Sequence, residues 1–178
     1  MALLWTSWTW TTTVGLLYVG LSLSTFSKVY RAEVETKKPE GDLWSLLVAS
    51  FFGAGLVFIY SIFSLCLLAG LTLRKKKRKA GFWYGFVTSG CVNLGLVTLL
   101  CSLVLHGYKN DVVTLFQLDA GVQWSPTDTA VFETTFIVGY VAAGFYVILG
   151  CVLYYGRTLL KWRDEEDGGE GEQSLLGR

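Results

Sequence analysis

The chain has 178 residues, of which 52% are hydrophobic and only 16% are charged, and its mean hydropathy is +0.46. Soluble domains carry about 25% charged residues, so this composition excludes a disordered chain and a nucleic-acid-binding protein and argues against a water-soluble enzyme. The 15 basic and 14 acidic residues nearly cancel, and their placement therefore says more than their sum.

Four stretches are long and apolar enough to cross a lipid bilayer. A spanning helix needs about 20 mostly apolar residues, and no charge lies in the middle of any of these stretches. Hydrocarbon offers no hydrogen-bond partner to the backbone, and the runs do not alternate as barrel strands do, so we expect helices. The predicted spans cover residues 3–26, 43–73, 81–105 and 132–155. The sequence thus predicts an all-α membrane protein, a four-transmembrane-helix bundle over residues 1–163.

For the first span there is an alternative interpretation, a signal peptide that is removed. Its N-terminal half is rich in threonine and tryptophan, and no Lys or Arg precedes Lys28. Signal peptides begin with a basic region, so we favour an uncleaved span.

Helix-start signals precede the second and fourth spans. Ser125, Pro126 and Asp128 supply an N-cap hydroxyl, a first-turn proline and an acid at the third position, which predicts a helix start near Pro126, above the membrane. Before the second span, the turn over residues 38–42 ends on Asp42, a predicted N-cap.

The basic residues predict the orientation. Ten lie in the connection between spans two and three and in the segment after span four, whereas five lie in the other two loops. The positive-inside rule places the ten in the cytoplasm. Both termini are then cytoplasmic, and the loops over residues 28–42 and 106–130 face the lumen or the cell exterior.

Each span carries small residues four positions apart, the spacing that lets membrane helices approach closely. We expect spans one and three to touch in the cytoplasmic half and spans two and four in the outer half. The predicted helix-packing residues are Ser7, Thr11 and Gly15; Ser45, Ala49 and Gly53; Gly81, Gly85, Ser89 and Asn93; and Thr135, Gly139 and Ala143.

Asn93 is the most polar side chain in the middle of a span. We expect it to form a hydrogen bond between helices inside the bundle. The alternative is a contact with a ligand or partner inside the bundle. The tyrosines at depth are expected to be packing residues whose hydroxyls need acceptors; these are Tyr18, Tyr60, Tyr140 and Tyr146.

The sequence predicts no catalytic residue, metal site or cofactor. A transporter or pump would require charged residues within its spans, but no Asp, Glu, Lys, Arg or His lies at mid-depth in any predicted span. His106 and Glu133 lie at the outer edges. The four cysteines form no C-x-x-C pair. The topology resembles that of the broad tetraspan group, but the chain lacks the Trp and cysteine motif of claudin-type loops and the Cys-Cys-Gly of tetraspanins.

Three segments outside the spans are candidate working surfaces. The loop of Arg74, Lys75, Lys76, Lys77, Arg78 and Lys79 anchors the topology and is a candidate site for anionic lipid. In the outer loop, Val112, Val113, Leu115, Phe116 and Leu118 form either an interfacial helix or a lid over the bundle, and we favour the lid. The acidic tail, residues 164–178, is expected to be disordered, and Glu172, Leu175 and Leu176 resemble an acidic dileucine sorting signal with the acid displaced by one position.

Together these features favour a non-enzymatic, multi-pass protein of the plasma membrane or an endomembrane. We expect it to act as an accessory, regulatory or trafficking partner of a channel, receptor or transporter through lateral protein–protein interaction. The alternative is a lipid-handling bundle that binds an apolar ligand beside Asn93.

Overall fold

The computed structural model describes residues 2–36, 41–73, 80–114 and 124–176, and every regular element in these ranges is a helix. The helices are α1 (Ala2–Thr36), α2 (Gly41–Leu73), α3 (Ala80–Gly107), the short α4 (Val112–Thr114) and α5 (Pro126–Leu176). Side-chain surroundings are described for most of residues 6–31, 45–63, 85–114 and 124–155. The all-α prediction is confirmed.

The long helices overlap the predicted spans, with differences at their ends. α2 begins at Gly41, so Asp42 lies inside the helix and not at its N-cap. Helix boundaries shift by a residue or two because the end turns satisfy their hydrogen bonds in several ways. α5 begins at Pro126 as predicted.

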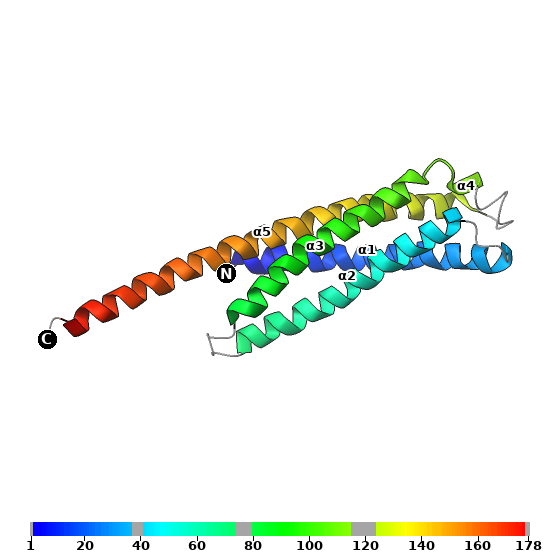
Figure 1. Ribbon diagram of the computed structural model, residues 1–178. Coiled ribbons are helices and arrows are strands. Elements are labelled where there is room, and N and C mark those ends of the chain that lie inside the picture. Colours follow the sequence, from blue (N-terminus) through cyan, green and yellow to red (C-terminus); the bar gives the residue numbers. More distant parts are fainter. Residues whose placement is uncertain (1, 37–40, 74–79, 115–123, 177–178) are drawn as a thin grey trace.

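The four long helices pack side by side in the order α1, α2, α3, α5 around the bundle (Figure 1). α1 and α3 each pack against both α2 and α5, so α1 and α3 are diagonally opposed, and so are α2 and α5. The predicted pairing of span one with span three, and of span two with span four, is therefore wrong. Short connections make consecutive helices neighbours, and in a four-membered ring this leaves the first and third apart.

Two helices in the described part of the chain are long and apolar enough to cross a membrane. They are Val87–Gly107 of α3 and Pro126–Tyr155 of α5. A shorter apolar stretch, Val48–Phe63, lies in α2.

The bundle buries hydroxyl side chains and exposes large aliphatic ones. The buried polar residues are Thr11, Ser22, Thr25, Ser50, Ser61, Thr98, Ser102 and Thr135. Thr98 and Ser102 show why their burial costs little: each hydroxyl donates to the carbonyl four residues earlier, at 2.7 and 2.8 Å. By contrast, Leu96, Leu100 and Ile148 are more than half exposed. This distribution is the one expected of helices that pack in lipid.

Apolar contacts form three clusters along the bundle. The first cluster lies at the end of the bundle where α1 finishes and α5 begins. There Trp124, just before α5, and Phe132, within α5, pack with Leu105 of α3. Tyr18 and Tyr146 lie in the middle cluster. The third cluster, towards the other end, is centred on Cys91, Leu149 and Leu153.

α5 continues well beyond the bundle, to Leu176 (Figure 1). Residues 164–176, which the sequence predicts to be disordered, are helical. Once a helix has formed, each added residue gains a backbone hydrogen bond without a new nucleation cost. Glutamate, the most frequent residue in this segment, is also a good helix former, and the helix continues despite three glycines.

Candidate functional site

Asn93, the polar residue predicted to act within the membrane, lies on the side of α3 that faces away from the bundle. Ser89 and Asn93 are both exposed. Asn93 Nδ2 donates to Ser89 Oγ at 3.4 Å, and its carboxamide oxygen has no partner among the described residues. The structure therefore places Asn93 on the surface, whereas the sequence predicted an interhelical bond inside the bundle. The inward side of α3 is formed instead by residues such as Cys91, Leu94 and Thr98.

Two other exposed polar side chains on the helices form hydrogen bonds within their own helix. Thr13 Oγ1 donates to the Thr9 carbonyl at 2.9 Å, and Thr134 Oγ1 donates to the Ala130 carbonyl at 2.7 Å. A hydroxyl can do this because it has a single donor close to its own backbone. A carboxamide has two donor hydrogens and an acceptor oxygen, so the bond from Asn93 to Ser89 leaves hydrogen-bonding capacity unused.

Exposed leucines continue this face along α3. Counting from Ser89, they follow Asn93 at alternating steps of three and four residues. The set, called the α3 seam below, is Ser89, Asn93, Leu96, Leu100 and Leu103, and its leucines are 51%, 61% and 50% exposed. α3 lies at the surface of the bundle (Figure 1), so the seam faces away from α2 and α5.

The small-residue stripes of the other three helices point into the bundle. Ser7 and Ser45, at the ends of two stripes, are half-buried. Gly85 of α3 is also half-buried, and the surroundings of Gly81 lie outside the described residues. The buried stripe residues are Thr11, Gly15, Ala49, Gly53, Thr135, Gly139 and Ala143. The stripe on α3 thus differs from the others by ending on the surface.

Gly53 and Gly139 make room for Tyr18 at the centre of the bundle. A Cβ atom on Gly53 would lie 2.5 Å from the Tyr18 hydroxyl. A Cβ atom on Gly139 would collide with the Ser102 hydroxyl and lie 2.8 Å from the Tyr18 ring. Four helices meet here because two of them lack a side chain.

The four tyrosines at depth pack as predicted, but only two have a described hydrogen-bond partner. Tyr60 donates to the Val87 carbonyl at 2.6 Å, and the Tyr140 hydroxyl lies 2.9 Å from His106 Nδ1. The hydroxyls of Tyr18 and Tyr146 are buried without a partner in the described part of the chain. Their rings fill the bundle axis, which accounts for their burial.

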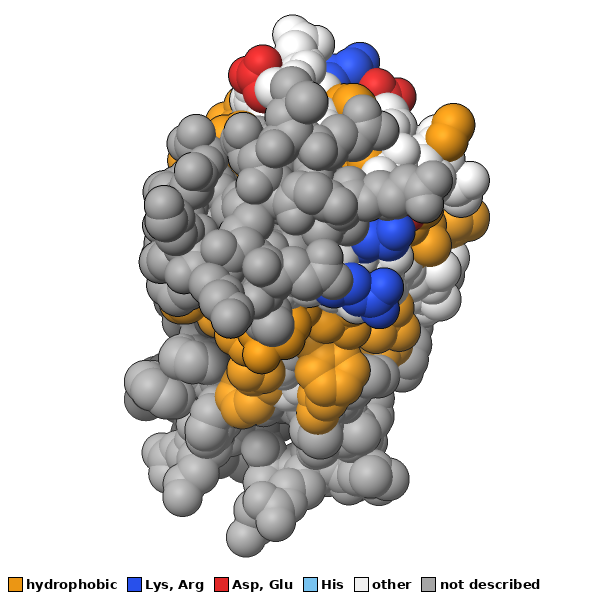
Figure 2. Space-filling model, turned by 90° about the vertical axis from the view of Figure 1, so that its right-hand side faces the viewer, with side chains coloured by type: hydrophobic (Ala, Val, Ile, Leu, Met, Phe, Trp, Pro, Cys, Tyr) orange, Lys and Arg blue, Asp and Glu red, His pale blue; other side chains and the backbone are white. Residues whose placement is uncertain are grey.

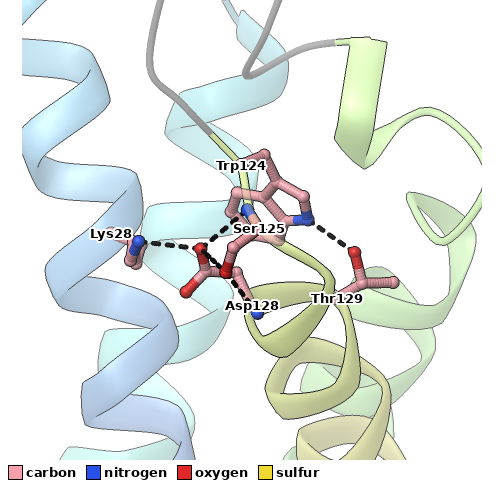
Figure 3. A network of polar contacts seen from close by, with 5 residues as sticks. All are labelled: Lys28, Trp124, Ser125, Asp128 and Thr129. Carbon is pink, nitrogen blue, oxygen red and sulfur yellow. Dashed lines mark hydrogen bonds and ion pairs between the residues drawn. The ribbon is translucent and has the colours of Figure 1, made fainter.

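A polar network joins α1 to the start of α5 (Figure 3). Lys28 Nζ lies 2.8 Å from Asp128 Oδ2. The Ser125 amide donates to that same oxygen at 3.0 Å, and the Asp128 amide donates to Ser125 Oγ at 3.2 Å. Trp124 Nε1 donates to Thr129 Oγ1 at 2.8 Å. The predicted N-cap is therefore confirmed. The Asp128 carboxylate of the same turn also binds Lys28 of α1.

The network stabilises the Asp128 carboxylate. Asp128 lies in the first turn of α5, before residue 132, where the predicted span begins. The hydrogen bond from Lys28 has the largest effect on the pKa of Asp128 and lowers it, whereas burial, the next largest effect, raises it. The hydrogen bonds from Ser125 lower it further, so that the pKa falls from 3.8 to about 2. The carboxylate is thus ionised throughout the physiological range.

The end face around this network is charged (Figure 2). Lys109 Nζ lies 3.3 Å from Glu133 Oε1, and His106 stacks on Phe136 with ring centroids 4.8 Å apart. All the charged side chains whose surroundings the structure describes belong to this end: Lys28, Arg31, Lys109, Asp111, Asp128 and Glu133. Among the side chains that the structure describes, charge is therefore found at this one end of the bundle.

The start of the outer loop packs onto the bundle. Val112 in α4 is fully buried beside Leu105 and Trp124, whereas Val113 is exposed. Burial of Val112 is what a lid over the bundle requires. Leu115, Phe116 and Leu118 lie outside the described residues.

Two predicted surfaces cannot be placed in the structure. The basic loop, residues 74–79, lies outside the described residues. Glu172, Leu175 and Leu176 belong to the helical extension of α5, but their side chains are not described. Both remain predictions from the sequence.

Groups for metal binding do not gather in the described part of the chain, where no cluster of three His, Cys, Asp or Glu side chains occurs. Cys91 and Cys101 are buried and Cys151 is exposed, all three as free thiols. No family model, curated protein or solved structure matches the chain. Its function must be argued from its own residues.

Proposed function

We propose that the protein is a four-span membrane protein with both termini in the cytoplasm. Helices cover all four predicted spans, and two of them contain stretches apolar enough to cross a bilayer. The buried hydroxyls and exposed leucines fit a lipid environment. The charged end face then lies at the outer surface, and the basic loop lies at the cytoplasmic surface, where it contacts anionic lipid.

Within that membrane, which is the plasma membrane or an endomembrane, the protein acts without enzymatic activity as an accessory, regulatory or trafficking partner of another membrane protein. The observation that carries this proposal is the outward orientation of Asn93. An amide exposed to hydrocarbon is costly, and a neighbouring helix that supplies a hydrogen bond gains roughly 0.6–2 kcal/mol. The α3 face is thus the part of the surface best suited to lateral association.

The lipid-handling alternative loses its supporting observation. It places an apolar ligand beside Asn93 inside the bundle, but Asn93 lies on the outside. No contact in the described residues favours it.

Site-specific photocrosslinking in cells tests lateral association. A photoreactive amino acid replaces Leu96 on the α3 face, and in the control it replaces Ile148, which is similarly exposed on α5. We expect discrete protein adducts from position 96 that are weakened by Asn93→Leu, and mainly lipid adducts from position 148. Lipid adducts alone at both positions would reject the proposal.

A further inference from the structure

We propose that the α3 seam pairs two copies of this chain side by side in the membrane. This inference rests on the proposed lateral association and names what covers the α3 face. Pairing of two copies and association with a different membrane protein then compete for this same α3 face.

The seam has the spacing of a coiled coil. The steps from Ser89 to Leu103 are four, three, four and three residues, which average 3.5 residues per repeat. Side chains repeating at 3.5 residues stay aligned between two helices that cross at a small left-handed angle. The seam residues are exposed together, so a second helix can contact all of them without any change in the bundle.

A second copy matches the chemistry of the seam. Two copies inserted with one topology are parallel, and a two-fold axis along the membrane normal brings each seam residue opposite its own counterpart. Asn93 then meets Asn93 at the same depth. A carboxamide is both donor and acceptor, so two of them complement each other, and a single asparagine among leucines sets the register and favours two strands.

The leucines on one side of the amide and the serine on the other complete the contact. Leu96, Leu100 and Leu103 supply apolar packing on one side of Asn93, and Ser89 supplies a small residue on the other. Ser89 Oγ already accepts a hydrogen bond from Asn93 within the same helix. This bond orients the Asn93 amide along the seam. The remaining donor and the carboxamide oxygen are left for the second copy.

Energy transfer between two differently labelled pools of the purified full chain tests the pairing. The copies carry dyes at the C-terminus and are reconstituted in phosphatidylcholine vesicles at decreasing protein-to-lipid ratios. We expect a dimer, with Asn93→Leu weakening association roughly 3- to 30-fold, as the loss of an interhelical hydrogen bond predicts. Thr134→Val is the matched control, because it removes an exposed hydroxyl that is already satisfied within α5, and should leave association unchanged.

Disulfide trapping provides a second readout that does not depend on the asparagine. In a background that carries Cys66→Ser and Cys151→Ser, Leu100→Cys places a thiol on the seam and Ile148→Cys places one on α5. Oxidation should link copies through position 100 and not through position 148. Equal linking at both positions, or a dimer that Asn93→Leu leaves intact, would overturn the inference.

The outcomes separate this inference from the proposed function. A chain that is monomeric in vesicles but yields adducts with a different protein at position 96 in cells would overturn the pairing and support the accessory role. A monomer that yields only lipid adducts would overturn both.

Discussion

Gly139 shows how a single missing side chain shapes this bundle. Its Cα lies so near Ser102 and the Tyr18 ring that no Cβ fits without movement. Gly144, further along α5, has open space around it. The same substitution therefore has opposite consequences at two glycines five residues apart.

We predict that Gly139→Ala destabilises the protein by roughly 1–3 kcal/mol, the usual cost of overpacking a well-packed core. Gly144→Ala should leave stability unchanged or raise it, because alanine is the better helix former. Thermal unfolding in detergent can be followed with a thiol-reactive dye in a background that carries Cys66→Ser and Cys151→Ser, since the remaining Cys91 and Cys101 are buried. Equal midpoints for the two variants would contradict the packing described here.

At this scale the sequence identifies the right residues more readily than their orientation. The stripes on α1, α2 and α5 were predicted to be packing residues, and most of them are buried. Asn93 was expected inside and lies outside. The inward side of α3 carries Thr98 and Ser102, whose hydroxyls bond to their own helix, so polarity does not distinguish the two sides of this helix.

Among the elements, the start of α5 is the most completely specified by local sequence. Ser125, Pro126 and Asp128 act within one turn, and the cap forms as predicted. The pairing of Asp128 with Lys28 joins residues 100 positions apart and has no local signature. The order of the helices around the bundle is likewise a long-range property, which the small-residue stripes did not reveal.

Ser125→Ala should destabilise the protein by about 1 kcal/mol, because the Asp128 amide loses its acceptor at the N-cap. Thr127→Ala is the control, since Thr127 is exposed in the same turn. The free energy of unfolding of both variants is measured by denaturation in a mixed-micelle titration. A larger loss for Thr127→Ala than for Ser125→Ala would be inconsistent with the cap.

The Lys28–Asp128 ion pair predicts a pH dependence of stability. The pKa of Asp128 is lowered to about 2 in the folded protein, below the value near 3.9 of an unfolded chain. Its contribution is therefore complete above about pH 4 and is lost as the pH falls towards 2. Both side chains are partly exposed, so the contribution is about 1 kcal/mol or less.

Unfolding midpoints measured between pH 5 and pH 2 test this dependence. Asp128→Asn should remove the part of the pH dependence of the unfolding midpoint that Asp128 contributes. Lys28→Met should make that part smaller. An unchanged pH profile in both variants would show that the ion pair does not contribute.

For the whole molecule, the apolar runs of the sequence predict the positions of all four long helices. The length of α5 was not predicted, because the composition of its last residues is that of a disordered tail while their attachment to a formed helix favours extension. The described part of the bundle nevertheless has a simple plan, with charge at one end and many hydroxyls buried inside. The proposed role of the protein follows from Asn93, whose exposed amide does not fit this plan.

Labelling of single cysteines in intact cells tests whether the chain crosses the membrane four times with both ends in the cytoplasm. In a background without the four native cysteines, Asn110→Cys, Lys77→Cys and Arg178→Cys are treated with an impermeant maleimide before and after permeabilisation. The account predicts labelling of position 110 from outside, and of positions 77 and 178 only after permeabilisation. Positions 77 and 178 on opposite sides, or position 110 on the same side as 77, would contradict it.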